Sequence, residues 1–564
     1  MQLVRASPCL KQFPLGVREL AARNTTRNAS TQSIWPRSAS QAPSTSSGLS
    51  NALQKRDITI DQLDGGRDKR ERVVVLGSGW AGYSLARQLD PSKYQCVVVS
   101  PRSYFAFTPL LASTAVGTLE FRTALEPIRT RRTKVDYFQG WADGVDFENK
   151  TITIEQSVDD PTTSLALTGD RHAHETKGQR EKQKQVEVQK GELFDLKYDK
   201  LVISVGCYSQ TFGTPGVKEH ALFLKDVGDA RQIRNRILAC FEAAALPTTS
   251  DETRKQLLNF AVVGGGPTGI EFSAELHDII TEDLAKIYPE LIKFHHITVY
   301  DVAEKVLPMF DEKLAKYAME TFRREGISIK TSHHVQELRP GAPGERVGSK
   351  NDHHMFTLKV KEEGDIGVGM VVWSTGLMQN PFVAKSLNKV SGVPEGSIEL
   401  LDLDSNKDIV KPTQWQVKKD SRSGSVFTNE RLQMKLETTG GNGKKQEAVM
   451  KDIYAIGDCA IMEGSVYPAT AQVASQKAVW LAKRLNRGDL EQSKFTWKNM
   501  GIMAYVGNWN ALLQGGEGGG ISGRAAWFIW RGAYLTKSVS LRNKILIPTY
   551  WFINWLFGRD ISRF

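Results

Sequence analysis

The chain has 564 residues, which is enough for several domains, each with an apolar core of its own. The net charge of +11 is confined to the two ends: residues 1–56 carry +7 and residues 523–564 carry +6, which leaves −2 for the body. A near-neutral body argues against nucleic-acid binding, which requires a basic folded face. The five cysteines show neither C-x-x-C nor C-x₄-C spacing, so the sequence predicts no zinc site and no redox disulfide.

Residues 1–56 are rich in arginine and serine and contain one acidic residue, Glu19. They lack the apolar core of a secretory signal. This composition is typical of a mitochondrial transit peptide. A disordered basic tail is the alternative interpretation.

The stretch Arg72–Gly82, RVVVLGSGWAG, reads as a buried strand, a tight turn and the start of a helix. Its three glycines, Gly77, Gly79 and Gly82, have G-x-G-x-x-G spacing and form the first glycine loop. The first glycine permits the turn, the second admits a pyrophosphate, and the third lets helix and strand pack closely. The next strand, Gln95–Ser100, ends in a serine where nicotinamide sites carry an acidic residue. This difference weakens a nicotinamide assignment for the first loop.

The stretch Asn259–Leu276, NFAVVGGGPTGIEFSAEL, repeats the pattern. Gly264, Gly266 and Gly269 form the second glycine loop, at the start of a helix that we expect to extend to about Ile287. The following strand, Ile297–Asp301, ends in an acidic residue. Asp301 can accept both ribose hydroxyls of NADH and would repel the 2′-phosphate of NADPH. Capping of a turn is the alternative role of Asp301.

Each glycine loop is followed by a further apolar strand that ends in glycine, Tyr198–Gly206 and Met370–Gly376. A helix is predicted from Asp226 to about Ala245. Another strand, Asp452–Ala460, contains Gly457 and Asp458 and precedes a helix that opens at Pro468. An aspartate in this position can bind a ribityl hydroxyl, although it can also cap the helix. The repeated order predicts an α/β fold with two Rossmann-like dinucleotide-binding domains.

Two further patterns carry no metal site. Acidic residues alternate from Asp402 to Asp408 as at the start of a calcium loop, but Lys407 and Thr413 occupy the positions that need glycine and a closing acid. The three histidine pairs, which lie in separate segments, are interpreted as surface residues: His295–His296, His333–His334 and His353–His354. The polar stretch 159–192 is interpreted as a solvated insertion.

The tail, residues 527–564, interleaves tryptophans with basic residues. Its apolar run Ile545–Phe557 has 13 residues and contains Pro548, so it is too short to span a bilayer. Aromatic and basic residues together are typical of amphipathic helices that lie in a membrane interface. The tail is therefore predicted to anchor a peripheral protein, with a dimer interface or packing on the core as the alternatives.

Two dinucleotide sites, of which one is nicotinamide-like, predict a flavoprotein that binds FAD at the first glycine loop and NADH at the second. Disulfide reductases of this build need a cysteine pair beside the flavin, and none follows Gly82. No iron–sulfur or haem motif is present either. A diffusible acceptor remains, and the membrane-interface tail favours a lipid-soluble quinone.

These segments together resemble the type II (alternative) NADH:ubiquinone oxidoreductases of fungal mitochondria. The resemblance covers residues 71–155, 195–385 and 425–564 and is carried by VVVLGSGWAG, SPRSYFAFTPLL, VVGGGPTGIEFSAEL, YAIGDCA, PATAQVASQKA and the terminal GRDISRF. It implies non-covalent FAD, a ping-pong-like reaction from NADH to ubiquinone without proton pumping, and a homodimer on the inner mitochondrial membrane.

The resemblance also implies residue roles. The FAD contacts would be Gly77, Gly79, Gly82, Ser100, Arg102, Gly206, Gly457 and Asp458. The NADH contacts would be Gly264, Gly266, Gly269, Asp301 and Gly376. Glu271 would handle protons between flavin and quinone, and Gln472, Gln476 and Tyr534 would lie at the quinone. Ser475 stands where related fungal sequences can show histidine, which puts a histidine-dependent proton role in doubt.

The predicted organisation is a transit peptide (1–56), an FAD domain in two parts (57–250 and 386–490), an NADH domain (251–385) and a C-terminal anchoring region (491–564). Polar insertions are expected at 159–192 and about 395–448. The matrix side of the membrane is favoured because no apolar stop segment follows the leader. Two other functions remain open: a soluble NADH-dependent reductase of a protein acceptor, and a flavoprotein of the apoptosis-inducing-factor kind.

Overall fold

The computed structural model describes residues 59–130, 134–158, 160–169, 191–345, 355–387, 389–390, 392–394, 396–401, 415–439, 445–465, 467–516 and 519–563. The predicted transit peptide, the calcium-like run and His353–His354 lie outside the described residues, as does most of the polar stretch 159–192. The other two histidine pairs are half-buried or exposed, as expected.

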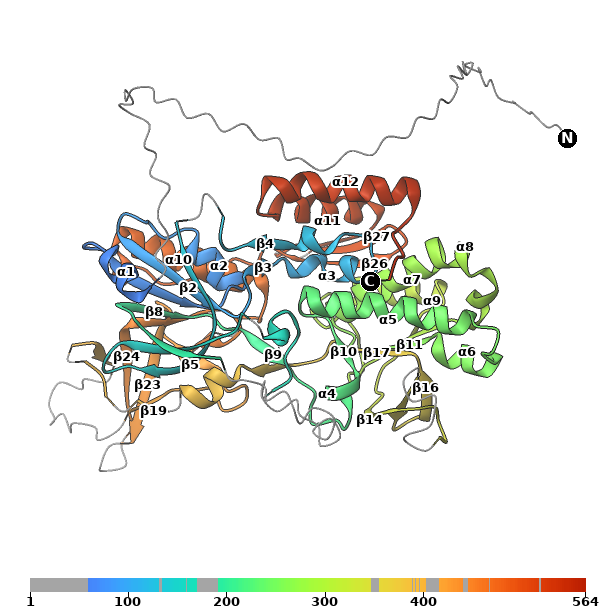
Figure 1. Ribbon diagram of the computed structural model, residues 1–564, viewed down its shortest axis with the longest axis horizontal. Coiled ribbons are helices and arrows are strands. Elements are labelled where there is room, and N and C mark those ends of the chain that lie inside the picture. Colours follow the sequence, from blue (N-terminus) through green and yellow to red (C-terminus); the bar gives the residue numbers. More distant parts are fainter. Residues whose placement is uncertain are drawn as a thin grey trace, which may run out of the picture. The chain divides into compact units, whose positions relative to one another are not determined.

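A thirteen-stranded sheet forms the first domain around a parallel centre of order β24-β8-β1-β2-β5 (Figure 1). These strands are β1 (Glu71–Leu76), β2 (Tyr94–Ser100), β5 (Asp136–Asp146), β8 (Lys200–Ile203) and β24 (Lys445–Ala455). Alternate residues of β1 enter different apolar clusters, Val73 and Val75 on one face and Val74 and Leu76 on the other. Burial on both faces explains why these strands are continuous apolar runs.

Antiparallel strands extend this sheet at both edges. They are β6 (Thr151–Gln156) and β7 (Leu193–Lys197) on one side, and β19 (Lys389–Val390), β20 (Ile398–Leu400), β21 (Trp415–Val417), β22 (Val426–Thr428), β23 (Gln433–Thr439) and β25 (Ala460–Met462) on the other. The described parts of 395–448 are therefore largely strands, in contrast to the predicted polar insertion. Strands β21 and β23 bury Trp415, Val417, Met434 and Leu436, and their polar alternate residues hid them in the sequence.

The second sheet is wholly parallel, in the order β10-β17-β11-β12-β13. Its strands are β10 (Leu222–Phe223), β11 (Asn259–Val263), β12 (His296–Tyr300), β13 (Ser328–Lys330) and β17 (Met370–Trp373). The associated helices are α5 (Val227–Ala245), α6 (Asp251–Leu257), α7 (Pro267–Ile279) and α9 (Glu312–Arg324). A π-helical turn, Ile280–Leu284, continues α7 into α8 (Ala285–Ile287), so the predicted helix end at about Ile287 is confirmed.

The boundary between the two domains differs from the predicted one at residue 250. Strand β10 pairs with β17, and α5 packs on both, so residues 222–245 belong to the second sheet. Because β10 has only two residues, no sequence pattern reveals it. The chain crosses between the sheets twice, and the two crossings, β9 (Cys207–Ser209) and β18 (Leu377–Gln379), pair antiparallel with each other.

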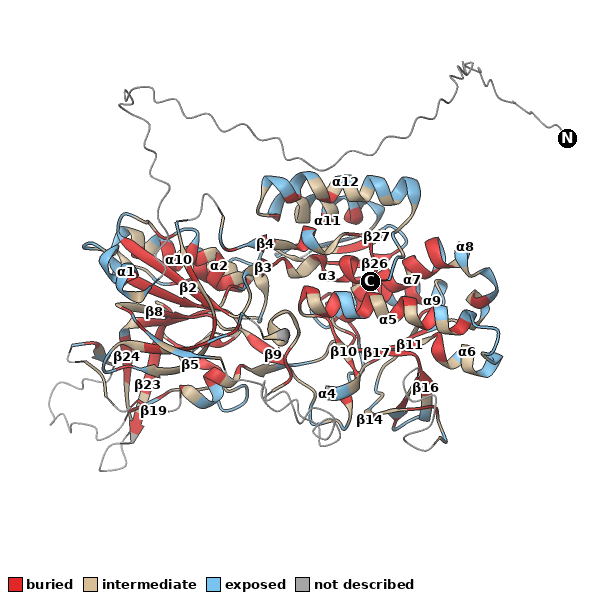
Figure 2. Ribbon diagram, viewed as in Figure 1, coloured by how far each residue is buried: buried red, intermediate tan, exposed pale blue. Residues whose placement is uncertain are grey.

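The C-terminal region combines a small sheet with two helices. The sheet contains β26 (Ile502–Gly507), β27 (Asn510–Gln514) and β28 (Gly520–Gly523), and the helices are α11 (Arg524–Lys537) and α12 (Leu541–Phe557). Strand β26 packs on α7, and α11 buries Trp527 and Trp530. The outer face of α12 is exposed (Figure 2). Within the described ranges, no helix has both the length and the apolarity to cross a membrane.

The remaining elements are shorter or peripheral. They are α1 (Ile60–Gly65), α2 (Trp80–Ala86), α3 (Leu111–Ala115), α4 (Val217–His220), α10 (Ala471–Arg487), β3 (Tyr104–Ala106), β4 (Leu125–Pro127), β14 (Val335–Pro340), β15 (Phe356–Val360) and β16 (Gly364–Val368). Helices α2 and α10 pack against each other beside the first sheet.

Candidate active site

The two glycine loops have the same geometry. Gly77 and Gly264 both have positive φ, +102° and +116°. A Cβ at Gly82 would lie 2.0 Å from the Gly77 oxygen, and a Cβ at Gly269 would lie 2.0 Å from the Gly264 oxygen. The middle glycines, Gly79 and Gly266, face open space, because a Cβ there would meet nothing within 4 Å. Both loops therefore fit a pyrophosphate that approaches the backbone at the start of a helix.

A cavity of about 550 Å³ lies between the two domains and is also reached by the C-terminal region. Ten of the predicted site residues line it: Gly77, Gly79, Ser100, Arg102, Gly206, Glu271, Gly376, Gly457, Asp458 and Tyr534. The others do not, namely Gly82, Gly264, Gly266, Gly269, Asp301, Gln472 and Gln476. The cavity brings residues from six distant parts of the chain to one place.

The wall of the cavity at the end of β24 carries charge. Burial raises the pKa of Asp458, while the ammonium groups of Lys225 and Lys477 oppose this rise. Lys225 donates to the Cys207 carbonyl and lines the cavity. Burial lowers the pKa of Lys477 to about 8. A carboxylate between two ammonium groups suits the polar chain of a bound flavin, so these residues fit FAD.

The cavity wall near β2 is polar without an acidic residue at the strand end. The Ser100 hydroxyl lies 2.8 Å from that of Ser78. Arg102 forms an ion pair of 2.5 Å with Asp226, which is buried and caps α5. The N-terminus of α5 is thereby tied to the first domain. Lys225 and Asp226 were not among the predicted site residues, although a charged pair directly before a helix was a visible signal.

Asp301 lies at the end of β12, beside the second glycine loop. Its carboxylate accepts hydrogen bonds from the backbone N–H groups of Gly265 and, at 2.7 Å, Ala303. In the structure Asp301 therefore holds the turn, which was the alternative interpretation of its role. The bonds also fix its carboxylate next to the second glycine loop.

Glu271, on the first turns of α7, faces the cavity beneath the C-terminal region. Its carboxyl accepts a hydrogen bond of 3.1 Å from the Tyr505 backbone N–H. Burial raises the pKa of Glu271 to about 8, and this hydrogen bond opposes the rise only in part. At neutral pH the group is therefore largely protonated and can donate a proton into the cavity.

Tyr534 reaches the same cavity from α11. Its ring packs edge-on against Trp530 and Phe107, with centroids 5.1 and 6.2 Å away. Burial raises the pKa of Tyr534, so the phenol stays neutral. The aromatic wall joins the cavity to the C-terminal helices and supplies an apolar surface for a flat ring.

Gln472 and Gln476 point away from the cavity and hold the segment 497–501 onto α10. Gln472 accepts from the Trp497 indole at 3.1 Å and from the Met500 backbone at 3.0 Å, and it donates to the Gly501 carbonyl at 3.2 Å. Gln476 exchanges two hydrogen bonds with the Lys498 backbone, at 2.9 and 3.0 Å. The structure does not bring either amide to the cavity, and Ser475 lies 3.4 Å from the Ser84 hydroxyl.

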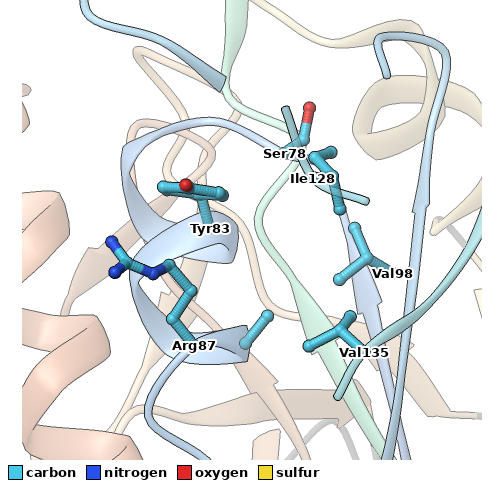
Figure 3. A pocket seen from close by; sticks show the side chains of 7 residues that line it. Ser78, Tyr83, Arg87, Val98, Ile128 and Val135 are labelled. Carbon is cyan, nitrogen blue, oxygen red and sulfur yellow. The ribbon is translucent and has the colours of Figure 1, made fainter. Parts of the chain in front are cut away.

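A second, much smaller cavity of about 10 Å³ lies beside α2 (Figure 3). Its lining includes Tyr83, Val98 and Val135, and the Arg87 guanidinium lies over the Tyr83 ring. This space holds one water at most and is no ligand site. Cys96, Cys207, Cys240 and Cys459 are buried and unpaired, and the part of the chain that the structure describes contains no metal-binding cluster.

Comparisons with known proteins agree with this geometry. Residues 71–399 match the pyridine nucleotide-disulphide oxidoreductase family, and residues 499–560 match the NDH2 C-terminal domain. The chain belongs to the type II NADH dehydrogenase (NDH2) family. The "probable NADH dehydrogenase" of Dictyostelium discoideum is 35% identical, over 92% of this chain and 96% of the relative. An external and an internal mitochondrial alternative NAD(P)H-ubiquinone oxidoreductase of Solanum tuberosum are each 33% identical, over 88% of this chain and 91% and 88% of theirs.

Solved structures show the same fold. An NDH2 from Plasmodium falciparum, determined with NADH, has a TM-score of 0.67 at 22% identity and covers 87% of this chain and 100% of its own. The predicted two-domain α/β flavoprotein fold and the NDH2 family are thus confirmed. These relatives come from a slime mould, a plant and a parasite, so a fungal origin is not shown.

Proposed function

We propose that this NDH2 protein oxidises NADH and reduces ubiquinone without pumping protons. The observation that carries the proposal is the shared cavity. Residues of the predicted FAD domain and of the predicted NADH domain line it together with Glu271 and with Tyr534 of α11. When bound, FAD accepts a hydride from NADH and passes two electrons to the quinone. The curated relatives named as NAD(P)H-ubiquinone oxidoreductases support the same reaction.

The first loop and the wall around β2 and β24 hold FAD. Gly79 admits the pyrophosphate between Gly77 and Gly82, while Ser100 and Arg102 lie on the adenosine side. Gly206, Gly457 and Asp458 contact the rest of the FAD molecule. The supporting observations are the open space at Gly79 and the cavity-facing Asp458 carboxylate between two lysines.

NADH binds along the second loop, Gly264 to Gly269, with Gly376 beneath it and Asp301 at the ribose. Glu271 gives a proton to the quinone, which stacks near Tyr534. Gln472 and Gln476 shape the quinone site indirectly, through the segment 497–501 that they hold. The raised pKa of Glu271 and its place on the cavity wall support its role.

The C-terminal region anchors the protein to the inner mitochondrial membrane and contributes to a homodimer. The exposed side chains of Phe552, Trp555 and Phe557 support membrane contact. The matrix side is favoured from the leader, although the potato relatives include external and internal types. We expect protease to spare the protein in intact mitoplasts and to degrade it once they are ruptured; degradation in intact mitoplasts would place it on the outer face of the inner membrane.

Purified holoprotein should be yellow and should oxidise NADH with short-chain quinones. A flavin-loaded protein that turned over no quinone, but reduced a ferredoxin, would overturn this function in favour of the soluble reductase. Removal of residues 527–564 should abolish both membrane association and quinone turnover.

A further inference from the structure

The last residues of the chain form a buried junction with the body of the protein. The Arg559 guanidinium pairs with Asp283 at 2.6 Å and with Glu282 at 2.7 Å, both on the π-helical turn that continues α7. The Arg559 side chain is only 9% exposed. Its Nε also donates to the Thr118 hydroxyl at 3.0 Å. One side chain therefore joins the tail to the second domain and to the first.

Neighbouring contacts extend the junction. Asn554 at the end of α12 donates to the carbonyls of Gly117 and Thr118, at 3.0 and 2.9 Å. The Thr118 hydroxyl in turn donates at 2.7 Å to Glu275, which lies one helical turn after Glu271 on α7. A Cβ at Gly558 would lie 2.7 Å from the Asp283 carboxylate, so only glycine allows this approach.

The electrostatics of the junction keep Arg559 charged. Burial alone would lower the pKa of Arg559, but the carboxylates of Glu282, Glu275 and Asp283 outweigh it and raise the pKa. Since the guanidinium fork binds two carboxylates and a hydroxyl at once, its planar geometry fixes the tail in orientation as well as in place.

At its other contacts, α12 is bound to α11 and to the first domain. The Arg531 guanidinium of α11 is sandwiched between Trp527 and Trp551, 4.1 and 4.2 Å from their ring centroids. At the start of α12, the backbone N–H of Ser540 donates to Glu126 at 2.8 Å. Helix α11, which carries Tyr534 to the cavity, is thus positioned by an α12 that is fixed at both ends.

We propose that Arg559 is a positioning residue for the quinone step, which holds α12, and through it Tyr534 on α11, in register with Glu271 on α7. This inference rests on the proposed function. Arg559 does not line the cavity. Its loss lets the end of α12 separate from the π-helical turn, so the quinone site loosens while the glycine loops remain intact.

The test compares Arg559→Met holoenzyme with wild type for two acceptors, a short-chain ubiquinone and ferricyanide, with rates expressed per bound flavin. Because misplacement by about 1 Å can cost on the order of 10²-fold, we expect kcat/KM for quinone to fall by on the order of 10-fold to 10²-fold, mostly in KM. The rate of flavin reduction by NADH and the ferricyanide rate should stay within about twofold. Arg559→Lys should recover part of the quinone rate.

Arg563→Met is the matched control, because Arg563 lies in the same tail and is exposed. Hydrogen exchange gives a readout independent of turnover: residues 541–557 should exchange faster in Arg559→Met and not in Arg563→Met. If Arg559→Met lowered the quinone rate and the ferricyanide rate equally, Arg559 would have only a general structural role and the proposal would be overturned. Unchanged quinone kinetics would also overturn the proposal. Wild-type protein that reduces ferricyanide but no quinone would instead refute the proposed function.

Discussion

At the scale of single residues, we expect Glu271 to set the pH dependence of the proposed reaction. Its pKa is raised from 4.5 to about 8, chiefly by burial, so the acid is protonated at pH 7 and loses its proton above pH 8. We expect reoxidation of the reduced flavin by quinone to slow as the pH rises through about 8. Glu271→Gln should lower this rate by on the order of 10²-fold and should abolish the fall in rate as the pH rises through about 8.

Stopped-flow mixing of pre-reduced enzyme with quinone at pH 6 to 9.5 measures this dependence. Flavin reduction by NADH needs no proton from Glu271 and serves as the internal control. An unchanged alkaline limb in Glu271→Gln would assign the titration to another group.

Substitutions at two glycines of the first glycine loop, Gly79 and Gly82, are expected to have different effects. A Cβ at Gly82 would strike the Gly77 oxygen at 2.0 Å, whereas a Cβ at Gly79 meets no protein atom. Gly82→Ala should therefore destabilise the fold by about 1–3 kcal/mol or more. Gly79→Val should keep the melting temperature of the apoprotein but weaken FAD binding. Calorimetry of apoprotein and FAD titration separate the two effects; equal behaviour of the variants would contradict the pyrophosphate role of the loop.

Individual site residues were predictable where backbone geometry alone fixes them. The first and third glycine of each loop, Gly77 and Gly82, Gly264 and Gly269, are fixed by sterics, because a side chain there would strike backbone or neighbouring side-chain atoms. The amides of Gln472 and Gln476 were not predictable in the same way. Their partners, Trp497 to Gly501, lie 22 to 29 residues away in the sequence and come back through an irregular segment that no pattern describes.

At the scale of elements, we propose the outer face of α12 as the membrane-contacting surface. Phe552 and Phe557 are 60% and 79% exposed. Burying one such side chain in lipid contributes about 1.5–3 kcal/mol. Phe552→Ser with Phe557→Ser should lower binding to phosphatidylcholine–cardiolipin vesicles by about 10-fold or more. Leu246→Ser, which removes an exposed side chain after α5, should leave it unchanged in a flotation assay. Intact vesicle binding together with a loss of dimers would identify the face as the subunit interface.

The segment that follows α10 is held by amide hydrogen bonds. Gln476 satisfies both the N–H and the carbonyl of Lys498. Gln476→Ala should lower the unfolding free energy by about 1 kcal/mol and raise the KM for quinone without slowing flavin reduction. Lys483→Ala, at an exposed position of α10, is the control in urea unfolding. A change in KM with no change in stability would favour a direct contact of Gln476 with quinone.

Long apolar strands and capped helices were visible in the sequence, and short or amphipathic strands were not. The prediction of α5 was met almost to the residue, since Asp226 caps it with its side chain. Strands β21 and β23 were not predicted because polar residues alternate with apolar ones in their sequences, although Gln433, Lys435 and Thr438 are buried in the structure. The C-terminal sheet, β26 to β28, was not predicted either, because glycines and asparagines separate its strands and the tryptophans and basic residues of this region are typical of interfacial helices.

At the scale of the whole molecule, the fold brings the first glycine loop, the start of α7 nearly 190 residues further along the chain, and a C-terminal region to one cavity. Duplication of the strand–loop–helix unit was readable from the sequence. The closure of the cavity by α11 was not, because it depends on tertiary contacts such as those of Arg559 and Trp530 rather than on any local pattern.

In the proposed function, one cavity serves both halves of a quinone-reducing cycle. Anaerobic holoenzyme is mixed first with one equivalent of NADH and then with a short-chain ubiquinone, while flavin absorbance is followed. We predict that the flavin is reduced and then fully reoxidised, with one quinol formed per NADH and with both steps at least as fast as steady-state turnover. A flavin that is reduced by NADH but stays reduced in the presence of quinone would contradict the account.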